Sequence, residues 1–115
     1  MKASNITLKL SVVLFKEDGT FIAYCPALDL SGYGKTESEA KKSFEIVLNE
    51  FLKYTANKNT LEDELKKLGW VKKSEHSKKL TPPDFVDIIN KNKELQRVVN
   101  NNPIKTYNKA IPLYA

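Results

Sequence analysis

Residues 6–25 read ITLKLSVVLFKEDGTFIAYC, and this run sets the architecture of the chain. Every second residue from Ile6 to Leu14 is apolar, which is the period of a β-strand with one buried face. Asp18-Gly19 follows, and this pair favours a tight hairpin because glycine adopts positive φ without a steric penalty. A second strand is expected over residues 20–25, ending before Pro26, which has no N–H to donate to a sheet.

Residues 28–36 are expected to form a third strand, so that the three strands make an antiparallel meander. Gly32 and Gly34 lie within it, and they indicate either a bulge or a place where another backbone approaches closely. Either feature would bring a neighbouring element against this strand.

An amphipathic helix is expected to begin at Thr36. Thr36 and Glu39 fit a capping box, and Glu37 and Lys41 are spaced for an ion pair on the exposed side of the helix. The apolar residues recur at helical spacing and form one stripe: Ala40, Phe44, Val47, Leu48 and Phe51. The helix should therefore lie across one face of the sheet, which makes the fold class α+β.

The sequence beyond this helix predicts shorter elements. Asn57-Lys58-Asn59 ends the helix, and Thr60 is placed to cap a short helix through Leu68. Gly69 is placed to end that helix, and Trp70-Val71 offers a further short strand.

The C-terminal part is expected to be mainly helical. Thr81-Pro82-Pro83-Asp84 favours a helix start, and the spacing that follows predicts a helix with an interruption at residues 90–92. Residues 110–115 include Pro112 and predict at most a terminal edge strand. The predicted organisation is an α+β domain over residues 1–75 and a helical C-terminal extension over residues 76–115.

Composition narrows the class of protein. The chain has 115 residues, about the size of one domain, and its single cysteine and single histidine exclude an internal disulfide framework and a Cys/His zinc cluster. Its apolar runs fall well short of the roughly 20 residues that a membrane span needs, and the N-terminus lacks the apolar block of a signal peptide. We therefore expect a cytoplasmic domain that has no membrane association and no cofactor.

The net charge of +5 is unevenly distributed. Between Leu65 and Leu80, six lysines accompany a single acid, Glu75. These candidate nucleic-acid contacts are Lys66, Lys67, Lys72, Lys73, Lys78 and Lys79. The same segment also fits a solvated connector, because phosphate recognition usually adds arginine and interleaved aromatic residues.

The residues that could support catalysis have simpler structural explanations. Cys25 precedes a proline at a strand end, where a buried thiol is the common role, and His76 lies in a polar stretch typical of a surface. Residues 31–36 end in Gly-Lys-Thr but lack the first glycine of a phosphate-binding loop. No catalytic residue and no metal ligand is therefore assigned.

Residues 12–54 nevertheless resemble a known family. An acidic-glycine hairpin is followed by FIAYCPALDL (residues 21–30), by GYGKTESEA (residues 32–40) and by the amphipathic helix. This order resembles the HicB antitoxin family, and the matching positions are Ala23, Pro26, Leu28, Gly34, Thr36, Glu39 and Ala40. The chain departs from the family where Asp29-Leu30-Ser31-Gly32 replaces the usual Pro-Gly-Cys.

The resemblance implies a partial RNase H-like domain that has lost its acidic catalytic set and serves as a binding scaffold. Members of the family cover the active site of a small mRNA-cleaving ribonuclease toxin, and many bind their own operator through a C-terminal domain. The C-terminal half of this chain shows no clear DNA-binding motif, so toxin binding is the function that the resemblance carries over best.

The predicted partner surface lies on the side of the sheet that the helix leaves free. Phe15, Ile22 and Tyr24 should gather there, together with Val13, and this apolar patch would need either a partner or the C-terminal tail to cover it. A basic ribonuclease would favour the nearby acids Glu17, Asp18 and Asp29.

Two other readings stay open. One is a nucleic-acid-binding transcriptional autoregulator that uses the lysines between Leu65 and Leu80. The other is a homodimeric scaffold without a toxin, in which the C-terminal tail packs against a second copy. A metal-dependent hydrolase ranks last.

Overall fold

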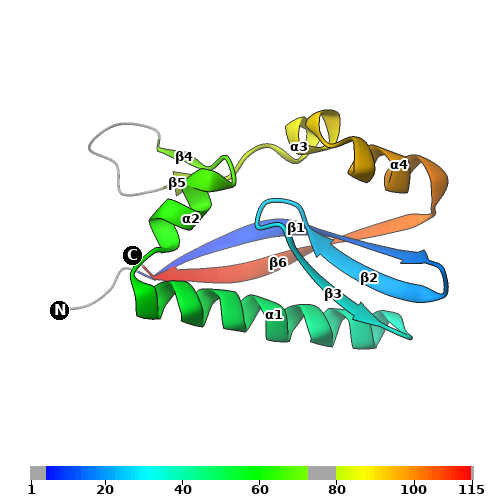
Figure 1. Cartoon of the computed structure of the whole chain (residues 1–115), viewed down its shortest axis with the longest axis horizontal. Coiled ribbons are helices and arrows are strands. Elements are labelled where there is room, and N and C mark those ends of the chain that lie inside the picture. Colours follow the sequence, from blue (N-terminus) through cyan, green and yellow to red (C-terminus); the bar gives the residue numbers. More distant parts are fainter. Residues whose placement is uncertain (1–4, 73–79, 115) are drawn as a thin grey trace.

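The computed structural model describes residues 5–72 and 80–114. Along these residues the elements are, in chain order, β1 (Asn5–Glu17), β2 (Thr20–Cys25), β3 (Leu30–Gly34), α1 (Glu37–Lys58), α2 (Leu61–Lys67), β4 (Val71–Lys72), β5 (Leu80–Thr81), α3 (Phe85–Lys91), α4 (Lys93–Asn101) and β6 (Ile104–Tyr114) (Figure 1). The fold class is α+β, as predicted. A four-stranded antiparallel sheet in the order β3-β2-β1-β6 forms its centre, and β4 and β5 pair separately.

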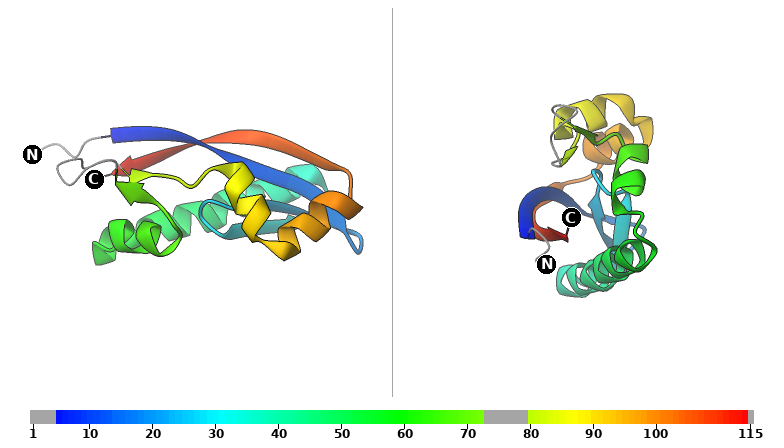
Figure 2. Two further views of the ribbon diagram at one scale, coloured as in Figure 1. Left: turned by 90° about the horizontal axis from the view of Figure 1, so that it is seen from above. Right: turned by 90° about the vertical axis from the view of Figure 1, so that its left-hand side faces the viewer.

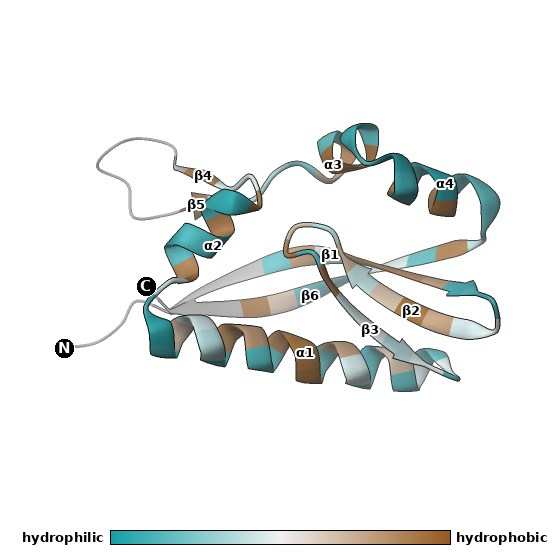
Figure 3. Cartoon of the chain, in the orientation of Figure 1, coloured by the Kyte–Doolittle hydropathy of each residue, from teal (hydrophilic) through white to brown (hydrophobic). Residues whose placement is uncertain are grey.

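Residues 12–15 of strand β1 are buried on both faces of the sheet. Leu10, Val12 and Leu14 belong to the larger core beneath α1, whereas Val13 and Phe15 belong to a second cluster on the opposite face. Figure 2 shows α1 on one side of the sheet and α3 and α4 on the other. Figure 3 shows that hydrophobic and hydrophilic positions alternate around α1, as expected for a helix with one buried side. The prediction of a helix packed on one face of the sheet is confirmed.

The β1–β2 hairpin forms as its sequence predicts. Asp18 and Gly19 both have positive φ, at 53° and 80°, which matches the two central residues of a type I′ turn. The turn sets the register, with Glu17 opposite Thr20. After β2, residues 26–29 form a turn in which Asp29 also has positive φ, so β3 begins at Leu30 and not at residue 28.

Helix α1 begins as predicted but closes only half of the capping box. The hydroxyl of Thr36 accepts a hydrogen bond from the N–H of Glu39 (3.1 Å), whereas the Glu39 carboxylate accepts from the N–H of Lys35 (3.4 Å). Asn59 ends the helix in the left-handed conformation. The second helix begins after Thr60, as predicted, although the Thr60 side chain makes no capping hydrogen bond.

The two glycines of β3 let α1 approach the sheet closely. A Cβ at Gly32 would lie 2.1 Å from the backbone nitrogen of Phe44, and one at Gly34 would lie 2.5 Å from the Cβ of Glu39. Both glycines therefore allow the backbone of α1 to approach β3 closely, which was one of the two interpretations of the sequence.

The terminal strand is longer than predicted. It begins at Ile104 instead of residue 110 and pairs with β1 from Phe15↔Ile104 to Asn5↔Tyr114. The extension is therefore not simply helical, and the main sheet has four strands where the predicted meander has three. The physical reason is that β1, whose residues 12–15 are buried on both faces, also needs hydrogen-bond partners along its second edge. The predicted domain boundary at residue 75 lies outside the described residues.

Three contacts tie β6 to α1. Lys105 pairs with Glu37 (3.0 Å), Lys41 lies 4.9 Å from the ring centre of Tyr107, and Lys109 pairs with Glu45. A helix rises by about 6 Å over four residues, and a strand rises by about 7 Å over two residues. Every fourth residue of α1 therefore lies beside every second residue of β6. Glu37 and Lys41 therefore contact β6 rather than forming the ion pair with each other that the sequence predicted.

Trp70 anchors the segment after α2. Its side chain is almost fully buried, and its Nε1–H donates a hydrogen bond to the carbonyl of Ala27 (2.8 Å). The indole therefore joins this segment to the turn between β2 and β3, 43 residues earlier.

Gly32→Ala is expected to lower the free energy of unfolding by about 3 kcal/mol or more, because the new methyl group would overlap the backbone of α1. Gly19→Ala is the control: it lies in open space but has positive φ, so its expected cost is about 1–2 kcal/mol. Urea unfolding of the two variants measures both values. Equal destabilisation by the two substitutions would contradict the conclusion that α1 approaches Gly32 too closely for a side chain.

Candidate partner-binding groove

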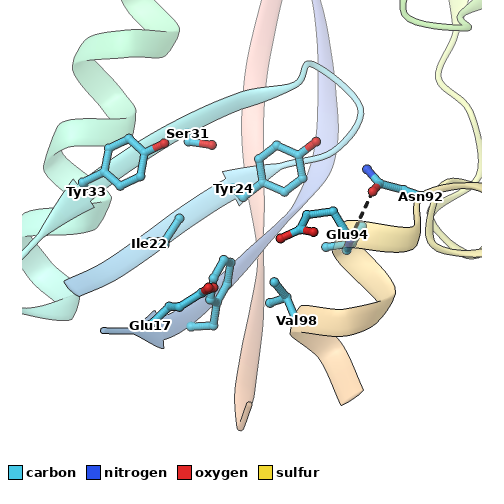
Figure 4. Close-up of a pocket in the computed structure, with 10 residues that line it drawn as sticks. Glu17, Ile22, Tyr24, Ser31, Tyr33, Asn92, Glu94 and Val98 are labelled. Atoms are coloured by element: carbon cyan, nitrogen blue, oxygen red, sulfur yellow. Dashed lines mark hydrogen bonds between the residues drawn. The ribbon is translucent and has the colours of Figure 1, made fainter. Parts of the chain in front are cut away.

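A groove lies between the free face of β1–β3 and helix α4 (Figure 4). Its volume is about 240 Å³. The sheet contributes Phe15, Glu17, Ile22, Tyr24, Ser31 and Tyr33, and the start and inner face of α4 contribute Asn92, Glu94, Leu95 and Val98.

The sheet side of the groove follows from strand register. Ile22 lies opposite both Phe15 of β1 and Tyr33 of β3, and Tyr24 lies opposite Ser31. Residues directly opposite each other in an antiparallel sheet point to the same face. Figure 4 shows the side chains of Ile22, Tyr24 and Tyr33 on this face.

Helix α4 forms the other wall. Asn92 interrupts the C-terminal helix, as predicted, and its side-chain oxygen accepts a hydrogen bond from the N–H of Leu95 (3.0 Å), which caps α4. Leu95 and Val98 are buried, and Val98 packs with Val13 and Phe15. The side predicted to be bare is therefore partly covered by α4, and Phe15 is only 7% exposed.

Three charged side chains meet at one end of the groove. The guanidinium of Arg97 contacts Glu17 at 3.1 Å and Glu94 at 2.5 Å. Hydrogen bonding to Arg97 lowers the pKa of Glu94, and the two carboxylates raise the pKa of Arg97. Two carboxylates thus face one cation, which leaves this end acidic in a chain whose net charge is +5.

The remaining predicted acids differ in position. Asp29 accepts a hydrogen bond from the hydroxyl of Tyr24 (2.8 Å), so it borders the groove. Burial and the neighbouring Asp29 raise the pKa of Tyr24, which keeps its hydroxyl protonated as the donor. Asp18 lies at the hairpin turn beside a different cavity of about 540 Å³, which Phe21 and Ile104 also line.

The structure thus joins four of the six predicted partner residues, Phe15, Glu17, Ile22 and Tyr24, in one groove, with Asp29 next to it. Sequence reasoning missed Ser31 and Tyr33, although their alternation within β3 was a usable signal. It left open whether a partner or the C-terminal tail covers this face, and it did not identify α4 as the wall. The signal there was the helical spacing of Leu95 and Val98, which requires a surface to pack against.

The predicted nucleic-acid contacts are only partly visible. Lys66 and Lys67 on α2 pair with Glu62 (3.6 Å) and Glu64 (3.5 Å), so part of their charge is neutralised locally. Lys72 ends β4, whereas Lys73, Lys78 and Lys79, like His76, lie outside the described residues. A role for these lysines in nucleic-acid binding stays a prediction.

Cys25 is fully buried, as the sequence predicts for a structural thiol. Burial raises the pKa of the thiol to about 11, so it is protonated and a poor nucleophile at neutral pH. Within residues 5–72 and 80–114, no three His, Cys, Asp or Glu side chains are grouped to hold a metal ion. None of the described helices has the length and apolar character to cross a bilayer.

Comparisons with family models, with curated proteins and with solved structures found no match for this chain.

Raising the pH from about 9 to about 11 is expected to destabilise the fold through Cys25, because the thiol ionises near 9.0 when unfolded but only near 11 when native. The protonated thiol contributes fully to the free energy of unfolding below the lower pKa, and this contribution is lost as the pH rises through the upper pKa. The free energy of unfolding should fall by roughly 2–3 kcal/mol in total. Urea unfolding across this range measures the loss. Cys25→Ala should lack this part of the pH dependence, and parallel curves for the two proteins would contradict the assignment.

Proposed function

We propose that this chain is a HicB-like antitoxin: a non-catalytic protein that neutralises a small mRNA-cleaving ribonuclease by binding over it. The observation that carries the proposal is the groove between β1–β3 and α4, which combines the exposed Tyr33 and the half-buried Tyr24 with an acidic end. A partner of this kind acts on mRNA, so the proposal places the protein in the cytoplasm.

The positions that carry the resemblance to the HicB family also shape this fold. Ala23 and Ala40 are fully buried between sheet and helix, and Leu28, in the turn that follows β2, is buried in the same core. Gly34 admits the start of α1, and Thr36 caps it. These positions support a shared fold, whereas the case for a shared function rests on the groove.

The chemistry of the groove suits a protein partner. Tyr33 is 58% exposed, and Tyr24 and Ile22 are half-buried, so aromatic and apolar surface is available beside α4. Tyrosine is enriched at protein interfaces because it offers a large rigid apolar area together with a hydroxyl.

The electrostatics favour a basic partner. Glu17 and Glu94 stand at one end of the groove, and Asp29 borders it. An RNA-cleaving enzyme carries cations that bind phosphate, and the same cations would be attracted to these carboxylates. Lysine or arginine side chains can also lie over the tyrosine rings.

Under this proposal, a short adjacent reading frame is expected to encode the ribonuclease. Tyr33→Ala is expected to weaken binding to the product of this adjacent gene by about thirtyfold, the effect of removing an interfacial hot spot worth about 2 kcal/mol. Tyr54→Ala on the outer face of α1 is the control, because Tyr54 is 60% exposed and lies on a different element. Titration calorimetry gives the affinities, and cleavage of mRNA by the partner, with and without this chain, gives the inhibition.

Two outcomes would count against the proposal. If the adjacent gene product forms no complex with this chain and its RNA cleavage is unaffected, the antitoxin function is wrong. If Tyr54→Ala weakens the complex as much as Tyr33→Ala does, the partner binds on another face.

A further inference from the structure

We propose that the outer edge of β6 binds the same edge of a second copy of this chain, joining two sheets into one continuous antiparallel sheet. The surface is separate from the groove, and the proposal does not depend on a ribonuclease partner.

In the described part of the chain, one edge of the main sheet is covered by a helix, and the other edge is open. At β3, helix α1 covers the edge: the backbone N–H of Tyr33 donates to the hydroxyl of Ser43 (3.1 Å), and Gly32 lies against Phe44. At the other edge, β1 occupies one side of β6, and within the described residues no strand pairs with its outer side. An open strand edge presents unpaired N–H and C=O groups to another strand.

The hairpin determines which groups of β6 point outward. Glu17 and Thr20 flank a two-residue turn, and such a pair exchanges both of its backbone hydrogen bonds. By alternation, Val13 also directs its backbone groups toward β2, so Thr106, which lies opposite Val13, directs its own away from β1. Asn108 and Ala110 follow with the same orientation.

Pro112 supports this assignment independently. Proline has no N–H, so it fits a sheet only where that group would point away from the neighbouring strand. Pro112 lies two residues after Ala110, so its backbone nitrogen points to the same side as those of Thr106, Asn108 and Ala110. The pairing with β1 continues past Pro112 to Tyr114.

The side chains along this edge leave room for a second strand. Thr106, Asn108 and Ala110 are exposed, small and uncharged. Lysines commonly protect strand edges by their charge, but Lys105 and Lys109 are each paired with a glutamate of α1. The edge is therefore both accessible and nearly neutral.

The occupant that fits best is an identical strand. A two-fold axis at Asn108 places Thr106 opposite Ala110 of the second copy. It also places the two Asn108 residues, one from each copy, opposite each other. These three pairs would exchange about six backbone hydrogen bonds. The axis also sets Lys109 opposite Tyr107 of the second copy, so no lysine faces a lysine, whereas an axis at Lys109 would oppose two like charges. Antiparallel pairing of one strand with itself is the self-complementary interface that a two-fold dimer requires.

The dimer would leave the groove open. The groove involves β1, β2, β3 and α4, whereas the proposed contact uses only the edge of β6 that points away from β1. Each dimer would therefore present two grooves.

Sedimentation velocity of the full chain over a wide concentration range tests the proposal. The wild type is expected to form dimers as concentration rises. Asn108→Asp should weaken association at neutral pH by about tenfold or more, because two carboxylates would face each other across the axis. Asn100→Asp on α4 is the control, since it adds the same charge at an exposed position away from β6.

A second variant tests the backbone contacts. Ala110→Pro removes an outward N–H and leaves the bonds to β1 intact, whereas Ala110→Ser keeps the N–H, so only the proline variant should become monomeric. Circular dichroism and thermal melting report whether each variant is folded. A wild type that stays monomeric at every concentration overturns the proposal, and so does a dimer that Asn108→Asp weakens no more than Asn100→Asp does.

Discussion

Burial of residues 12–15 of β1 on both faces of the sheet, together with pairing along both edges of the strand, is the constraint on which this structure depends. Val12 and Leu14 face the core beneath α1, and Val13 and Phe15 face the cluster beneath α4. A strand segment that is buried on both faces needs a covering element on each side, and its backbone needs partners along each edge. Helix α1, helix α4, β2 and β6 each meet one of these four requirements.

The two faces of the sheet have different characters because different elements cover them. On the α1 side, glycines in β3 bring helix and strand backbones together, and a continuous apolar stripe fills the core. On the other side, a nine-residue helix covers only part of the sheet, and a groove remains between them. Acidic groups gather at this groove although the chain as a whole is basic, which is why we propose partner binding there.

Much of the fold is predictable from short-range patterns. The Asp18-Gly19 turn, the Thr36 cap and the close approach at Gly32 all depend on residues within a few positions or on the stereochemistry of glycine. The groove was predictable in part, because strand alternation places Ile22 and Tyr24 on one face. Its second wall was not, since helical spacing shows that Leu95 and Val98 need a partner surface but does not identify that surface.

Local sequence thus specifies the hairpin, the helix caps and the faces that must be buried, because each of these depends on backbone preferences and on a period of two or 3.6 residues. Tertiary structure alone decides that β6 lies beside β1, that α4 covers Phe15, and that Arg97 meets Glu17, 80 residues earlier in the chain. Residues 104–114 contain lysines and a proline and lack a clear apolar alternation, so nothing local marks them as a long strand. They become one because β1 offers an unpaired edge, and α1 offers acids in step with Lys105 and Lys109.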